Sequence, residues 1–162
     1  MKLLHGILAA FSLLFVAGCG SSTTAPAPEA KSAEAPKPAR KILDETQKFP
    51  SQNRGAVTVV EPNVEGKPYL PAGNVAQYGT GKSAFKAFVI QTDSPTAAAI
   101  LLNDVRKNLT DAKLVPSFGG YFGTDSGIPY FVFPKGKWLA GVVGLPQDKA
   151  DAFARQFAAR IN

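Results

Sequence analysis

The chain has 162 residues, with 18 Lys and Arg against 12 Asp and Glu, which gives a formal net charge of +6 at pH 7. It contains one cysteine and one histidine, so a disulfide within the chain is excluded. The basic excess is modest and spread along the chain. It suits contact with anionic lipid headgroups or cell-wall polymers, whereas the absence of a Lys/Arg stripe or a binding motif argues against nucleic acid.

Residues 1–18 have the pattern of a secretory signal. Lys2 supplies the positive start, an apolar run extends from Leu3 to Ala17, and small residues precede Cys19. The run, at roughly 15 residues, is short for a helix that must cross a hydrocarbon core needing about 20. We therefore expect a cleaved signal peptide. Its removal would take His5 with it, and Ser-His-Asp sites, Cys-His sites and Cys/His zinc sites would then be excluded.

The phrase Val16-Ala17-Gly18-Cys19, followed at once by polar residues, resembles the lipobox of bacterial lipoprotein precursors. The resemblance implies that the Cys19 sulfur receives a diacylglyceryl group, that cleavage occurs before Cys19, and that the new amine is usually acylated with a fatty acid such as palmitate. The lipid bilayer would then be a partner through these acyl chains. Since Gly20 and Ser21 follow and no Asp adjoins the cysteine, the resemblance implies outer-membrane delivery facing the periplasm, if the host has an outer membrane.

Residues 19–40 are expected to be the lipidated cysteine and a tether. Residues 20–40 are rich in Ala, Pro, Ser, Thr, Glu and Lys and contain no aromatic and no branched aliphatic side chain. Such a segment cannot bury enough apolar surface to offset the entropy of ordering it. We expect a disordered, proline-stiffened spacer.

Residues 41–162 are expected to form a single α+β globular domain. Its first half predicts a short helix at 41–49, a strand at 56–60, a turn-rich stretch at 63–74, and a hairpin whose arms are 75–78 and 83–92. A helix should then begin at Pro95, where Ser94 or Asp93 can cap the free amides. Its apolar stripe comprises Ala98, Leu101, Leu102, Val105 and Leu109.

The second half is aromatic and ends in another helix. Residues 118–122 are a strand or loop, 129–134 and 137–144 are strands joined by a turn at 135–136, and 146–161 is a helix. The buried stripe expected for that helix is Ala150, Phe153, Ala154, Phe157 and Ile161. The fold class predicted is α+β, a mostly antiparallel sheet with two long helices packed on one face.

Two motifs resemble catalytic signatures incompletely. Residues 79–83 (GTGKS) end like a phosphate-binding P-loop, but Ala76 stands where the first glycine is needed and a strand is expected to follow, so a hairpin turn is the better interpretation. Asp125-Ser126-Gly127 is similar to the turn of aspartic proteases, whose chemistry needs two carboxylates. One copy could serve only in a homodimer, and the flanking residues depart from that pattern, so a polar loop is favoured.

The aromatic residues between 118 and 138 allow two interpretations. Most should be core, because a domain of this size needs large apolar side chains between sheet and helices. If helices cover one face, however, some of these rings lie on the other face and can stack on sugars or grip a protein. The candidate binding surface comprises Tyr121, Tyr130, Lys135, Lys137 and Trp138.

Three function classes remain open on the sequence alone. The favoured one is a membrane-anchored envelope lipoprotein with a non-catalytic domain that binds or positions an envelope protein or cell-wall polymer. The alternatives are a structural or assembly accessory of an envelope complex, and a carboxylate- or Lys-dependent hydrolase. We predict no catalytic residues, no metal ligands and no cofactor.

Overall fold

The computed structural model describes residues 41–162. The signal sequence, lipobox and tether predicted for residues 1–40 lie outside the described residues. The described part contains seven strands, two α-helices and three short 3-10 helices. In chain order they are η1 (Thr46–Lys48), β1 (Arg54–Val60), η2 (Val64–Gly66), β2 (Gly73–Tyr78), η3 (Gly81–Ser83), β3 (Phe85–Gln91), α1 (Pro95–Lys107), β4 (Thr110–Val115), β5 (Gly120–Asp125), β6 (Ile128–Lys135), β7 (Trp138–Val143) and α2 (Gln147–Ala158).

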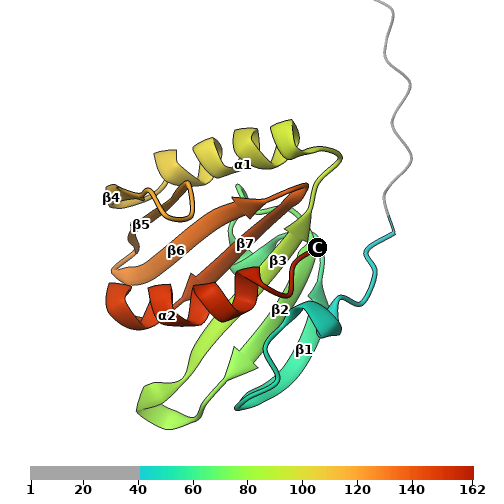
Figure 1. Ribbon diagram of the computed structural model, residues 1–162, viewed down its shortest axis with the longest axis vertical. Helices are drawn as coiled ribbons and strands as arrows, with labels where there is room; N and C mark the ends of the chain where they lie inside the picture. The colour runs from blue at the N-terminus through green and yellow to red at the C-terminus, as the bar shows by residue number, and fades with distance from the viewer. Residues whose placement is uncertain (1–40) are drawn as a thin grey trace, which may run out of the picture. The chain divides into compact units, whose positions relative to one another are not determined.

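The strands form one antiparallel sheet in the order β1-β2-β3-β7-β6-β5-β4 (Figure 1). The first three strands make a meander, and α1 then carries the chain to the far edge, where β4 begins. A second meander returns from β4 to β7, which pairs with β3 at the centre of the sheet. The prediction of an α+β fold with a mostly antiparallel sheet is confirmed.

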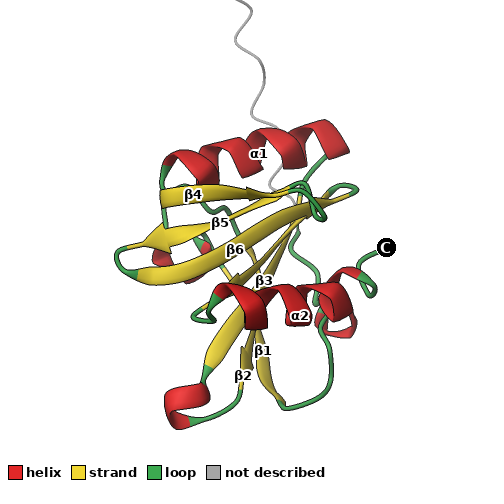
Figure 2. Cartoon of the chain, turned by 60° about the vertical axis from the view of Figure 1, so that its left-hand side comes forward, coloured by secondary structure: helices red, strands yellow, loops and turns green. Residues whose placement is uncertain are grey.

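The two helices pack on opposite faces of this sheet, so the prediction that they share one face is wrong. Leu102 and Val105 of α1 pack with Phe88, Val132 and other residues of one face. On the other face, the buried α2 side chains Ala150, Ala154 and Phe157 pack with the alternate residues of the same strands, which are Ala87, Val89, Phe131, Phe133, Ala140 and Val142. Figure 2 shows β4, β5 and β6 lying between the two helices. The helices, with 13 and 12 residues, are also of ordinary length.

The central strands show why both faces are covered. All six residues of β7 are buried, and so are Tyr130–Phe133 in the middle of β6. Successive residues of a strand point to opposite faces, and a continuous buried run therefore needs a layer on each side. The helices supply these two layers.

The helix starts and stripes follow the sequence closely. Ser94 caps α1 by accepting a hydrogen bond from the Ala97 amide at 3.1 Å, and Pro95 occupies the first turn. The stripe of α1 is buried except for the half-buried Leu101, and that of α2 is buried except for the half-buried Phe153. Each helix thus presents the predicted face to its own side of the sheet.

Two local predictions differ from the structure. Within 41–49 only Thr46–Lys48 is helical, as a 3-10 turn, because the Leu43 carbonyl and the Glu45 amide before it are hydrogen-bonded to the Asn74 side chain instead of within a helix. Strand β4 was not predicted: its register shifts between Thr110 and Lys113 and Asp111 has φ 52°. A bulged edge strand loses the strict alternation by which a strand is recognised.

Candidate functional site

The five residues of the predicted binding surface do not form one exposed aromatic surface. Tyr130 is 1% exposed and packs on the α1 face, whereas Trp138 is 4% exposed and packs on the α2 face. The expectation that these two rings are exposed is therefore wrong, because helices cover both faces. Burial also raises the pKa of Tyr130 to about 12, so its phenol stays neutral at ordinary pH.

The remaining members of that surface are Tyr121 on β5 and two lysines at the turn between β6 and β7. Tyr121 is half-buried beneath Arg106, whose guanidinium carbon lies 5.3 Å from the ring centre. Lys135 and Lys137 are exposed near the turn between β6 and β7. Lys137 Nζ lies 5.8 Å from the centre of the Trp138 ring, which Lys48 Nζ approaches to 4.4 Å. Cys19, the predicted lipidation site, lies outside the described residues.

The protease-like turn holds a carboxylate that is ion-paired. Asp125 accepts a 2.7 Å contact from Lys67 Nζ, a hydrogen bond from the Tyr69 hydroxyl and one from Ser126 Oγ at 2.9 Å. These groups, Lys67 foremost, lower the pKa of Asp125. The carboxylate therefore stays charged and ties the β5–β6 turn to the segment after η2, an environment unlike the proton-sharing pair of an aspartic protease.

The P-loop-like residues form the hairpin turn that the sequence favoured. Tyr78 pairs with Phe85 at the ends of β2 and β3, and the turn between them contains the 3-10 helix η3. Gly79 and Gly81 have φ of 63° and 56°, values that glycine adopts without strain. The tip of this hairpin extends past α2 (Figure 1).

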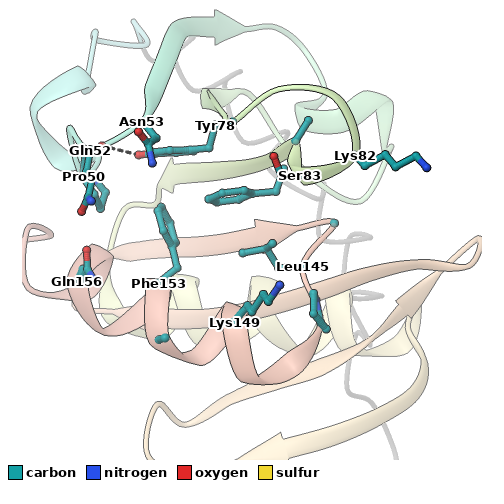
Figure 3. A pocket seen from close by; sticks show the side chains of 16 residues that line it. Pro50, Gln52, Asn53, Tyr78, Lys82, Ser83, Leu145, Lys149, Phe153 and Gln156 are labelled. Atoms are coloured by element: carbon teal, nitrogen blue, oxygen red, sulfur yellow. Dashed lines mark hydrogen bonds between the residues drawn. The ribbon is translucent and has the colours of Figure 1, made fainter.

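A cleft of about 610 Å³ opens between this hairpin tip, the turn before β1, and α2 with the loop that precedes it (Figure 3). Its volume falls within the range of about 300–1,000 Å³ typical of small-molecule sites. Its lining residues are Pro50, Gln52, Asn53, Tyr78, Gly79, Lys82, Ser83, Ala84, Phe85, Gly144, Leu145, Pro146, Lys149, Ala152, Phe153 and Gln156. We call it the hairpin cleft.

Three aromatic rings meet at the base of the hairpin cleft. The rings of Tyr78 and Phe85 stack with centroids 4.9 Å apart and an interplanar angle of 11°. Phe153 meets both edge-on, at 4.8 and 5.0 Å. Tyr78 is fixed because its hydroxyl donates to the Pro50 carbonyl at 2.8 Å, and burial raises its pKa to about 12. The half-buried Phe85 and Phe153 rings present their remaining surface to the cleft.

The rim of the hairpin cleft is polar and positively charged. Gln52, Asn53 and Gln156 supply amides, while Lys82 and Lys149 supply two cations, and no lining residue is acidic. Neither lysine has an ion-pair partner among residues 41–162. Figure 3 shows Phe153 and Lys149 rising from α2 towards the hairpin, while Lys82 extends outward from its tip. The arrangement can hold an apolar group against rings and a negative group near Lys149.

A second hollow, of about 290 Å³, lies beside the same hairpin and has a different charge balance. It is lined by Glu65 and Lys86, which form an ion pair at 2.8 Å, together with Ile128 and Val143. Because Glu65 and Lys86 neutralise each other, this hollow offers a ligand fewer free charged groups than the hairpin cleft does.

The sequence carried partial signals for the cleft. Phe153 belongs to the predicted apolar stripe of α2, and Lys82 belongs to the predicted hairpin turn. Lys149 stands in the first turn of α2, where the helix dipole disfavours a cation. Neither the stripe nor the turn indicated that α2 and the hairpin would line the same cleft, because their juxtaposition depends on how α2 crosses the sheet.

Within residues 41–162 no helix is both long and apolar enough to span a membrane. No group of three or more His, Cys, Asp or Glu side chains in this part of the chain is arranged to hold a metal ion. Comparison of the chain with protein-family models, with curated proteins and with solved structures gives no match.

Proposed function

We propose that the protein is a lipid-anchored lipoprotein of the bacterial cell envelope whose folded domain binds a ligand in the hairpin cleft without chemical turnover. Cys19 carries the lipid, residues 20–40 form the link to the domain, and the domain faces the periplasm where the host has an outer membrane. Stable anchoring takes about two lipid signals, which the modification of Cys19 implied by the lipobox would supply.

The hairpin cleft is the observation that carries the binding function. It combines a volume of about 610 Å³ with a base of fixed aromatic rings and a rim of amides and lysines. Apolar walls with a few polar groups are the usual composition of ligand sites. The cleft offers rings and cations but no carboxylate for proton transfer, which favours binding over carboxylate-dependent hydrolysis.

The anchoring is tested by intact-mass measurement of the protein extracted from membranes. We expect a chain that begins at Cys19 and carries added mass for a diacylglyceryl group and an amide-linked acyl chain. An unmodified Cys19 or a retained Met1 would contradict this part of the proposal.

The binding is tested by a fragment screen followed by amide NMR spectra of residues 19–162 carrying Cys19→Ser, which has no thiol to acylate. We expect fragments with flat apolar bodies to shift signals of Gly79, Phe85, Gly144 and Phe153, all of which line the cleft. A screen that shifts none of these signals, or that shifts signals only elsewhere, would overturn the cleft as the binding site.

The assembly alternative has one observation in its favour. Strand β1 lies at an edge of the sheet, and its residues from Gly55 to Val60 carry no charge, with Val59 44% exposed. Edge strands without charge can pair with a strand of another chain. Co-purification of the membrane-anchored protein and of its Val59→Lys variant distinguishes the assembly role from ligand binding in the cleft. An assembly role predicts a partner protein that co-purifies with the wild type and is lost in the variant.

A further inference from the structure

We propose that the ligand of the hairpin cleft is a small amphipathic organic anion, with a flat apolar body and one acidic group, of which an aromatic carboxylate is the simplest example. This inference rests on the binding function proposed above and adds the chemical class of the ligand. It follows from the shape of the aromatic base, the positive charge of the rim and the spacing along α2 between the aromatic rings and Lys149.

The base of the cleft selects a flat apolar body. Tyr78 and Phe85 are stacked nearly parallel and Phe153 stands edge-on to both, so the rings buttress one another. Phe153 is held from behind by Phe157, whose ring centre lies 5.9 Å away. A ring or short acyl body placed here gains burial against Phe85, Phe153 and Leu145 at little cost in side-chain ordering, since the walls are already fixed.

The rim selects a negative charge. Lys149 lies one helical turn before Phe153 on α2, and both residues line the cleft. Residues four apart lie on the same face of a helix, so an anion bound near Lys149 leaves its apolar body over Phe153. Lys82 adds a second cation from the hairpin, and its flexible stem allows it to approach from the outer side.

The acidic residues near the cleft do not neutralise Lys82 and Lys149. Asp151 on α2 is engaged by Arg155 at 2.9 Å, and Asp148 precedes Lys149 on the helix but does not line the cleft. The Lys86 of the neighbouring hollow already pairs with Glu65. Lys82 and Lys149 are thus the cationic side chains of the cleft left to meet a ligand.

The class is tested with two probes that share a body and differ in charge, 2-naphthoate and 2-naphthylmethanol, titrated into residues 19–162 carrying Cys19→Ser. Amide NMR shifts give the affinities. We expect 2-naphthoate to bind about fivefold or more tightly, and Lys149→Gln to weaken its binding about two- to fivefold, the range for an exposed ion pair. Binding of 2-naphthylmethanol should be unchanged by Lys149→Gln.

Two matched variants complete the design. Lys135→Gln removes an exposed lysine on the β6–β7 turn that does not line the cleft, and it should leave both affinities unchanged. Phe153→Leu should weaken both probes, because it removes part of the ring surface while keeping an apolar side chain on the stripe of α2. Thermal melts of each variant verify that the fold is retained.

The outcomes separate the class from the function. Equal affinities for the two probes, both reduced by Phe153→Leu, would overturn the anionic class and leave the cleft as a binding site. Equal weakening by Lys149→Gln and Lys135→Gln would overturn the class too, because the charge effect would then come from the whole surface. If neither probe shifts the signals of the cleft although fragments of the screen do, the class fails and the cleft stands as a binding site. If neither the probes nor any fragment shift these signals, both the class and the proposed function fail.

Discussion

Asp125 shows what a single side chain contributes to this fold. Its carboxylate, 13% exposed, collects Lys67, Tyr69 and Ser126 around one turn. The sequence drew attention to this residue for its resemblance to a protease turn, yet its neighbours give it a structural task. Hydrogen bonds to a charged group stabilise a fold by about 1.5–3 kcal/mol, more than an exposed ion pair does.

We predict that Asp125→Asn lowers the free energy of unfolding by about 1–3 kcal/mol at pH 7. The pKa of Asp125 is lower in the folded protein than in the unfolded chain. The stabilisation is therefore present at neutral pH and is lost as the pH falls below about 4, through the folded-state pKa. Urea unfolding at several pH values checks this.

The matched control for that prediction is Asp104→Asn, which removes the exposed pair with Lys107. We expect this variant to lose much less stability than Asp125→Asn. A difference between wild type and Asp125→Asn that stays constant from pH 7 to pH 2 would show that the charge of Asp125 is not what stabilises the turn.

At the scale of elements, the central pairing of β3 with β7 depends on one glycine. Phe88 of β3 lies opposite Gly141 of β7 in the register of the two strands. The Phe88 ring occupies the space above Gly141, where an added Cβ would overlap it. Phe88 is fully buried on the α1 face, so the ring cannot move into solvent. The large Phe88 side chain therefore occupies the space that the absent side chain of Gly141 leaves in the core.

We predict that Gly141→Ala lowers the free energy of unfolding by about 1–3 kcal/mol, the usual cost of overpacking a core. Gly55→Ala in edge strand β1 is the control, because a Cβ there meets its nearest neighbour, the Gln77 carbonyl oxygen, at 3.4 Å. That change should stay within about 0.5 kcal/mol. Chemical denaturation compares the two, and equal losses would mean that the Phe88 ring has room to shift.

At the scale of the whole molecule, residues 43–45 are hydrogen-bonded to strand β2 through the side chain of Asn74. The Leu43 carbonyl accepts a hydrogen bond from Asn74 Nδ2 at 2.9 Å, and the Asn74 side-chain oxygen accepts one from the Glu45 amide at 3.1 Å. Asn74 is 2% exposed. A buried amide needs its partners, so these few residues belong to the fold.

We predict that a chain starting at Arg40 melts within a few degrees of one that starts at residue 19, since residues 20–40 offer no aromatic or branched aliphatic side chain to bury. A chain starting at Thr46 should melt clearly lower. It leaves Asn74 without two partners, at a cost of about 1–3 kcal/mol. Thermal melts followed by circular dichroism test both. A marked loss on removing residues 19–39 alone would show that this segment packs on the domain.

The sequence determined the local features of this protein. Ser94 and Pro95 fixed the start of α1 because an amide needs a cap and proline has no donor to lose. The stripes of both helices, the hairpin across residues 79–82 and the β6–β7 turn follow from spacing and from glycine, which adopts positive φ freely. Strand β4 was not predicted because its bulge breaks the alternation that marks a strand.

Tertiary structure decided which face each helix covers, and with it the site. The buried runs Tyr130–Phe133 and Trp138–Val143 held the signal for two covered faces, but placing both helices on one side made Tyr130 and Trp138 candidates for binding. The hairpin cleft joins Lys82 and Phe85 to Lys149 and Phe153, more than 60 residues apart in the chain. Local spacing cannot bring such segments together, because their contact depends on how α2 packs across the sheet after β7 has paired with β3.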